Sequence, residues 1–139
     1  KENLQLFIHT FEQVVAATIP ESSKIPEIDI DCEIELSDIN ERFYNTINRF
    51  APFGPENMKP VFLTRNVQHI RSTVIKDEHL RMTIAQNGSK LNAIGFNLGK
   101  EKIDALFGAL HYDIVYTIEE NEWKGNKSLQ LRIIDIRKA

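Results

Sequence analysis

The feature that most constrains this fold is a cluster of three prolines within residues 51–60. Proline fixes φ and lacks a backbone N–H, so neither a helix nor a sheet ladder can run through this segment. The segment therefore predicts a boundary, with a helix–strand–helix unit over 1–50, a Pro-rich connector over 51–60 and a second domain over 61–139. The connector acts either as a semi-rigid strut between the two parts or simply as a tight link from helix to strand.

Periodicity indicates helices at both ends of the first unit. Apolar residues recur at helical spacing over 2–18, which predicts an amphipathic helix followed by a linker over 21–26. Residues 28–36 alternate Ile, Cys or Leu with Asp or Glu, which predicts a half-buried strand with Cys32 as a buried structural thiol on its apolar side. Ser37 is expected to cap a second helix that ends at the connector.

Strand patterns dominate the region after the connector. The expected elements are strands at 61–75, 80–84 and 91–96, a helix at 100–110, and strands at 112–118 and 129–136. Asn87-Gly88 is a strong signal for a tight hairpin between the second and third of these strands. The order predicts a mainly β fold, a five-stranded OB-type barrel (β-β-β-α-β-β) preceded by the helix–strand–helix segment. Other small barrels and an α+β sandwich are the alternatives.

Composition excludes several classes of protein. No stretch approaches the roughly 18 apolar residues that a membrane-spanning helix requires. The single cysteine excludes an internal disulfide framework and a cysteine-based zinc site. The expectation is a soluble, cytoplasmic protein with no membrane partner.

The sequence contains no recognisable catalytic motif. It has no Gly-rich phosphate loop, no nucleophile elbow and no pair of histidines at ligand spacing. The carboxylates of residues 29–35 alternate along one predicted strand, where side chains two residues apart lie about 7 Å apart, too far to share one metal ion. We therefore expect no catalytic residue and no metal ligand in this chain.

Charge favours the second domain as a binding surface. The net charge of −3 divides into −6 over residues 1–60 and +3 over residues 61–139. OB barrels hold single strands across their second and third strands and between the loops that join strands one–two and four–five. The candidate nucleic-acid-binding residues in those regions are Arg71, Lys76, His79, Arg81, Lys90, Asn92, Trp123, Lys124, Asn126 and Lys127.

Two of these regions allow more than one interpretation. Trp123 lies between polar and basic residues in an expected loop, so its indole either stacks on a base or folds back to cap the end of the barrel. Asp77 and Glu78 follow Lys76 directly, and their negative charges oppose phosphate binding at that loop.

Several segments resemble, in order, the C-terminal OB domain of the RecJ family of single-strand-specific exonucleases. They are Phe-Ala-Pro-Phe-Gly-Pro-Glu-Asn at 50–57, Lys-Pro-Val-Phe at 59–62, His-Leu-Arg-Met at 79–82, Asn-Glu-Trp-Lys-Gly at 121–125, Leu-Gln-Leu at 129–131 and Asp-Ile-Arg at 135–137. Residues 2–18 resemble the helix that closes the second catalytic subdomain of that family. The family usually has Gly where this sequence has Ile75, before the lysine of the first loop.

The resemblance implies a longer parent enzyme that degrades single-stranded DNA from the 5′ end with Mn²⁺ or Mg²⁺, in DNA repair and recombination. The Asp-His-His and Gly-Gly-His segments of that enzyme are absent here, so this chain is expected to be an excised piece that binds rather than cuts. The implied partners are single-stranded DNA, the catalytic subdomains of the parent and a single-strand-binding protein. The alternative function is a protein-interaction or bracing module that docks such a partner.

Overall fold

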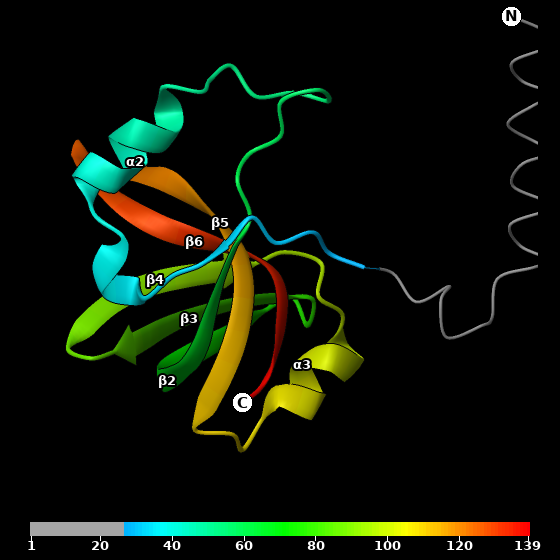
Figure 1. Ribbon diagram of the computed structural model, residues 1–139. Helices are drawn as coiled ribbons and strands as arrows, with labels where there is room; N and C mark the ends of the chain where they lie inside the picture. Colours follow the sequence, from blue (N-terminus) through cyan, green and yellow to red (C-terminus); the bar gives the residue numbers. More distant parts are fainter. Residues whose placement is uncertain (1–26) are drawn as a thin grey trace, which may run out of the picture.

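The computed structural model describes residues 27–139 (Figure 1). The helix predicted over 2–18 and the linker over 21–26 lie outside the described residues. The elements in order are β1 (Cys32–Glu33), the 3₁₀ turn η2 (Leu36–Asp38), α2 (Glu41–Asn48), β2 (Phe62–Ile75), β3 (His79–Gln86), β4 (Ser89–Gly95), α3 (Lys100–Leu106), β5 (His111–Trp123) and β6 (Asn126–Lys138). Within 27–139, no helix is both long enough and apolar enough to cross a bilayer.

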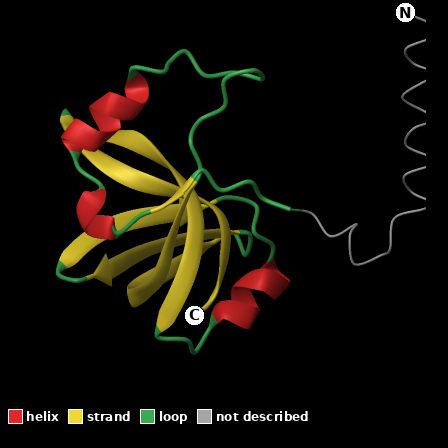
Figure 2. Cartoon of the chain, in the orientation of Figure 1, coloured by secondary structure: helices red, strands yellow, loops and turns green. Residues whose placement is uncertain are grey.

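Strands β2 to β6 close into a barrel. β2 pairs antiparallel with β3, β3 with β4, and β5 with β6, while β4 pairs in parallel with β6. The ring closes because β5 also pairs antiparallel with the first half of β2. This order, with α3 between the third and fourth barrel strands, confirms the predicted five-stranded OB barrel (Figure 2).

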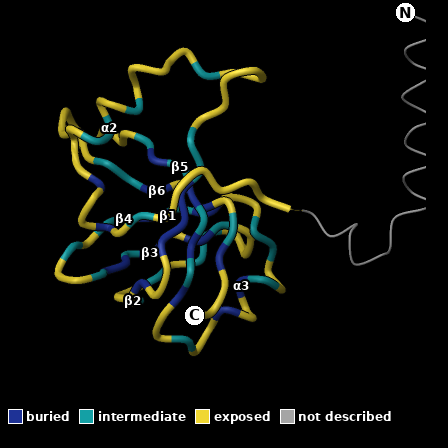
Figure 3. Tube along the Cα trace, in the orientation of Figure 1, coloured by how far each residue is buried: buried dark blue, intermediate teal, exposed yellow. Residues whose placement is uncertain are grey.

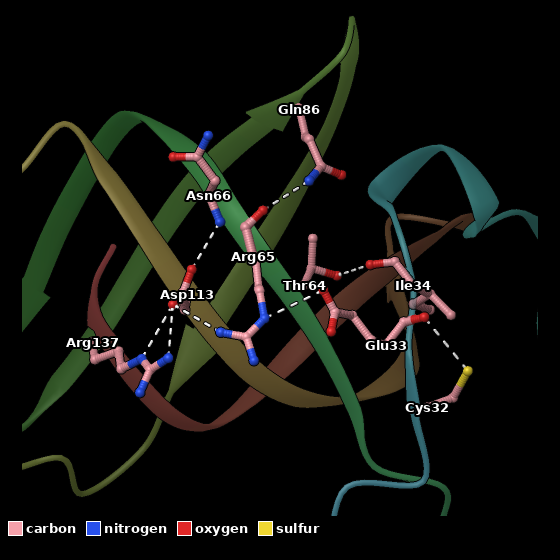
Figure 4. Close-up of polar contacts among 9 residues, drawn as sticks. All are labelled: Cys32, Glu33, Ile34, Thr64, Arg65, Asn66, Gln86, Asp113 and Arg137. Carbon is pink, nitrogen blue, oxygen red and sulfur yellow. Dashed lines mark hydrogen bonds and ion pairs between the residues drawn. The ribbon is translucent and has the colours of Figure 1, made fainter.

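β2 pairs on both sides because it bends. Its register with β5 shifts between Thr64 and Val67, where Asn66 adopts a φ of 57° in a β-bulge. The carboxylate of Asp113 on β5 holds this bulge, since Oδ1 accepts a hydrogen bond from the Asn66 N–H at 2.9 Å. The other oxygen, Oδ2, accepts from Nε of Arg137 on β6 at 3.1 Å (Figure 4). One side chain therefore joins β2, β5 and β6 at the bend.

Helical segments cover the two ends of the barrel. Leu36 of η2 and Ile39 are buried in the same core as the inward-facing barrel residues. Ile103 and Leu106 of α3 are also buried in that core. Figure 1 places α2 and α3 at opposite ends of the barrel, and Figure 3 shows the buried residues concentrated between them.

A chain of hydroxyl groups inside the barrel fastens the N-terminal segment to it. Thr64 Oγ1 lies 2.8 Å from the carbonyl oxygen of Ile34 and 2.7 Å from the hydroxyl of Tyr116. Because a carbonyl can only accept, Thr64 donates to Ile34 and accepts from Tyr116. Both side chains are fully buried, and burial raises the pKa of Tyr116 to about 12.

The segment over 28–36 differs from its predicted structure. Only Cys32–Glu33 forms a strand, which pairs on one side with β2. Within residues 27–139 no second layer packs on this segment, and Ile28 and Ile30, which precede the strand, are about two-fifths exposed. Cys32 is also exposed, and the prediction of a buried thiol is wrong.

The second predicted helix begins later than expected. Asn40, not Ser37, is the N-cap, and its Oδ1 accepts a hydrogen bond from the Phe43 N–H at 2.9 Å. The preceding residues form η2 instead, because Leu36 and Ile39 turn into the barrel core. Tertiary burial here decides the helix boundary over the local capping preference.

The strand predictions for the barrel are confirmed, with two differences in extent. β5 and β6 are each 13 residues long, so the loop expected around Trp123 is only the two-residue turn Lys124-Gly125. Asn87-Gly88 forms the expected tight turn, with both residues at positive φ. α3 ends at Leu106, four residues before the predicted end, and Gly108 follows at a φ of 88°.

Removing the Thr64 hydroxyl should destabilise the fold more than removing the Tyr116 hydroxyl. Tyr116→Phe deletes one hydrogen bond and should lower the free energy of unfolding by about 1 kcal/mol. Thr64→Val leaves both the Tyr116 hydroxyl and the Ile34 carbonyl without their hydrogen-bond partner, and should lower the free energy of unfolding by about 2 kcal/mol. Urea denaturation measures both, with Thr117→Val on the outer face as the control. Equal costs for the two variants would show that Thr64 does not bridge both partners.

Burial of Tyr116 also predicts a pH dependence of stability. The folded state keeps the phenol protonated up to a pKa of about 12, above the ordinary value of 10.0. The unfolded state therefore loses its proton first, so the stabilisation is complete below pH 10 and is lost as pH rises to 12. Two pKa units correspond to about 2.7 kcal/mol. Because this loss exceeds the cost of the deleted hydrogen bond, the difference in unfolding free energy between the wild type and Tyr116→Phe should fall across that range and change sign before pH 12.

Candidate nucleic-acid interface

A groove crosses the outer face of the barrel. It has a volume of about 770 Å³ and lies over β2, β3 and β4, with the β5–β6 hairpin along one side. Its lining residues are Arg71, Ser72, Thr73, Arg81, Met82, Thr83, Asn92, Ala93, Ile94, Phe96, Asn121, Trp123 and Gln130. The lining contains two arginines and no carboxylate, so the groove favours a negatively charged ligand.

Strand alternation explains which side chains reach the groove. Along β3, Leu80 and Met82 are buried in the barrel core, which leaves Arg81 and Thr83 on the outer face. On β4, Asn92 is exposed for the same reason, since Ala93 is buried. The inward apolar positions and the outward polar positions are therefore two results of one pattern.

A row of polar groups crosses the groove floor. Arg71 Nε lies 3.4 Å from Thr83 Oγ1, which donates a hydrogen bond to Asn92 Oδ1 at 3.0 Å. Asn92 is in register with Gln130 of β6. The floor thus presents a guanidinium and two side-chain amides side by side, groups that can bind phosphate oxygens and base edges.

Trp123 is the last residue of β5 and lines the groove with 70% of its surface exposed. The Lys124 Nζ lies 5.9 Å from the centroid of its ring. The indole therefore does not cap the end of the barrel, and one of the two interpretations of this residue is removed. An exposed ring beside a cation can stack on a planar group.

The groove brings together four of the ten predicted residues. Arg71, Arg81, Asn92 and Trp123 line it. The other six, which are Lys76, His79, Lys90, Lys124, Asn126 and Lys127, are not lining residues.

Several of those six have other roles or positions. His79 Nδ1 accepts a hydrogen bond from the Asn97 N–H at 3.0 Å, so it supports the chain after β4. Lys127 forms an ion pair with Glu120 at 3.7 Å. Side chains of a strand point alternately to its two faces, and Trp123 is paired with Asn126 on the groove face. Lys127 therefore lies on the opposite face of the hairpin. Lys76 lies in the tight turn between β2 and β3 at a φ of 53°.

The groove also contains residues that the sequence analysis did not select. Thr83, Phe96, Asn121 and Gln130 line it together with the four predicted residues. The signal that could have found Phe96 is alternation, because it continues the outward series of Asn92 and Ile94 at two-residue steps. Gln130 follows only from the parallel pairing of β4 with β6, which sequence periodicity does not reveal.

The acidic residues before the barrel do not gather into a metal site. Asp31 Oδ2 accepts a hydrogen bond from the Val61 N–H at 2.8 Å, while Glu33 pairs with Arg65 at 3.3 Å. Among residues 27–139, no group of three His, Cys, Asp or Glu side chains lies close enough to hold a metal ion. The described residues therefore do not fit the divalent metal that the resemblance implies for a parent enzyme.

Related sequences are bacterial exonucleases. The single-stranded-DNA-specific exonuclease RecJ of Bacillus subtilis is 32% identical over 127 residues, which are 88% of this chain and 16% of that protein. The protein of the same name from Haemophilus influenzae is 28% identical over 136 residues, 96% of this chain and 24% of that protein. The chain thus spans only 16% to 24% of the length of these relatives.

Solved structures share the fold at low identity. RecJ of Thermus thermophilus in complex with Mn²⁺ has a TM-score of 0.64 at 15% identity, over 97% of this chain and 20% of that chain. A putative aspartyl-tRNA synthetase of Leishmania major has a TM-score of 0.52 at 14% identity, over 80% of this chain and 22% of that chain. The barrel is therefore shared with a protein of a different named activity.

The family assignment comes from the sequence itself. The family model described as the RecJ OB domain matches residues 30–135, which include β1, α2 and every barrel strand except the last three residues of β6. Together with the 32% identity to a RecJ protein, this match establishes that the chain belongs to the RecJ OB domain family.

Proposed function

We propose that this domain binds single-stranded DNA without reading its sequence and holds it for the catalytic part of a RecJ-type exonuclease, in DNA repair and recombination. The observation that carries this proposal is the groove, which combines an exposed indole at Trp123 with two arginines and no carboxylate. The groove lies across the barrel face on which OB folds bind nucleic acid strands.

The lining explains how a strand would be held. The guanidinium groups of Arg71 and Arg81 neutralise phosphates and release counterions. The Trp123 ring stacks on a base, a contact worth roughly 1–3 kcal/mol. Every base has a π-face, so a stacking contact tolerates any sequence.

The same contacts favour single strands over duplexes. A base reaches the Trp123 ring only when it has left the stack of a duplex. Amide groups such as those of Asn92 and Asn121 can donate and accept, so they adapt to the exposed edges of different bases.

Cleavage is assigned to other parts of a longer enzyme. The relatives in sequence are named single-stranded-DNA-specific exonucleases and are four to six times longer than this chain. The described residues offer no cluster for a metal ion. We therefore place the Mn²⁺ or Mg²⁺ of the parent in its catalytic half, with this domain as a non-catalytic strand holder.

A bracing role is the second candidate. The connector before β2 leaves Phe50 65% exposed and Met58 76% exposed. Exposed apolar side chains of this kind fit a surface that packs on the catalytic half or on a partner such as a single-strand-binding protein. This role predicts no DNA binding by the domain itself.

Binding should depend on salt and on the two arginines. Fluorescence anisotropy with a labelled single strand should show a dissociation constant that rises with salt, and weaker binding to the matching duplex. Arg71→Gln and Arg81→Gln should each lower the slope of log K against log salt by about 0.7, the value of one phosphate contact on a single strand. Arg42→Gln on α2 is the matched control. Absence of binding at low salt would reject the strand-holding role in favour of bracing.

Trp123→Ala should weaken binding of single-stranded DNA without lowering the thermal stability of the domain. Loss of the stack should weaken single-strand binding by about 1–3 kcal/mol, or about 5- to 150-fold. Because the ring is 70% exposed, the melting temperature should change little. Anisotropy and thermal melting measure the two effects on the same sample. A large fall in melting temperature with unchanged binding would contradict the assignment.

A further inference from the structure

We propose that Phe96 is a second base-stacking platform, at the other end of the groove from Trp123, and that His79 and Arg132 are the residues that position it. This inference rests on the proposed binding of single-stranded DNA. It extends that function by assigning a stacking role to Phe96 and a positioning role to His79 and Arg132, all of which lie outside the hairpin tip.

Phe96 is placed like a ligand-binding ring. It is the first residue after β4, it lines the groove, and 43% of its surface is exposed. The next outward residue on β4 is Ile94, which is paired with Arg81 and also lines the groove, so the ring continues a surface of mixed polar and apolar side chains. A phenyl ring left open among polar groups gains from covering by a flat partner such as a base.

Two neighbours hold the Phe96 ring. The guanidinium carbon of Arg132 lies 5.1 Å from the ring centroid, in cation–π geometry. The imidazole of His79 meets the ring edge at a centroid distance of 5.6 Å and an interplanar angle of 66°. His79 is itself fixed, since its Nδ1 accepts a hydrogen bond from the Asn97 N–H.

These contacts leave the groove side of the ring available. Phe96 lines the groove, whereas Arg132 and His79 do not. Arg132 is two residues after Gln130 on the same face of β6, so it flanks the groove beside the ring, and His79 contacts the ring from the start of β3. A ring held before binding loses little side-chain freedom when a base stacks on it, which lowers the cost of the contact.

Strand register separates the two aromatic platforms. Arg132 is paired with Ile94, two residues before Phe96, and Asn126 is paired with Trp123. Arg132 lies six residues after Asn126 along β6, a separation of about 20 Å at the rise of a strand. At a stacked rise of 3.4 Å this corresponds to about six nucleotides, within the range of site sizes known for OB folds. One strand of that length or longer can contact both rings.

The first test compares a strand with bases and a strand without them. Phe96→Ala should weaken binding of a labelled 12-residue oligothymidylate at least fivefold, and binding of a 12-residue abasic strand less than twofold, because only the first has bases to stack. Phe96→Trp should restore oligothymidylate binding. Phe107→Ala is the matched control, since Phe107 is 53% exposed and lies outside the groove. Thermal melting checks that each variant is folded.

The outcomes separate this inference from the proposed function. If Trp123→Ala weakens binding but Phe96→Ala does not, the second platform is rejected and the strand-holding role stands. Equal losses with both strands would also reject it, since the effect would not depend on bases. If the wild type binds neither strand, both proposals fail.

The positioning role of Arg132 has its own readout. Arg132→Gln should weaken oligothymidylate binding while leaving the slope of log K against log salt unchanged, because the guanidinium acts on the ring and not on a phosphate. Arg81→Gln is the comparison, with an expected slope change of about 0.7. A similar slope change for Arg132→Gln would overturn the positioning role and make Arg132 a phosphate contact.

Discussion

The bend in β2 is the constraint on which the rest of the barrel depends. A straight strand could pair with β3 or with β5, but the ring closes only because β2 pairs with both. The bulge at Asn66 makes this possible, and Asp113 satisfies the N–H that the bulge frees from the ladder. The Asp113 carboxylate also binds Arg137, so the end of β6 is held at the same point.

Closure of the barrel creates both the core and the candidate site. Thr64 and Tyr116 face inward, where their hydroxyls join the carbonyl of Ile34 and so attach the N-terminal segment. On the outer face, the same closure brings β6 beside β4, which places Gln130 next to Asn92. The groove is therefore a consequence of the pairing that completes the ring. The outward residues can vary without disturbing the core, which suits a surface used for binding.

Local signals in the sequence predict where an element forms, but burial also depends on what packs against that element. Asn87-Gly88 and the alternation of β3 are local, and the structure has the elements that they predict. The alternation over 28–36 is just as regular, yet Cys32 is exposed because none of the described residues forms a layer over that segment. Arg81 and Asn92 were found because both are polar residues at outward positions of their strands. Lys127 was selected for its charge, but hairpin register places it on the other face.

The sequence by itself determined the order of strands, the position of α3 and the break in regular structure at the Pro-rich connector, because alternation, turn residues and proline act on neighbouring residues. It also contained enough of the family pattern for the RecJ resemblance. Tertiary structure alone decided the bulge at Asn66, the late start of α2 and the place of Gln130 in the groove. Each of these depends on which distant strand lies alongside, and pairing between distant strands is not encoded in the spacing of any single segment.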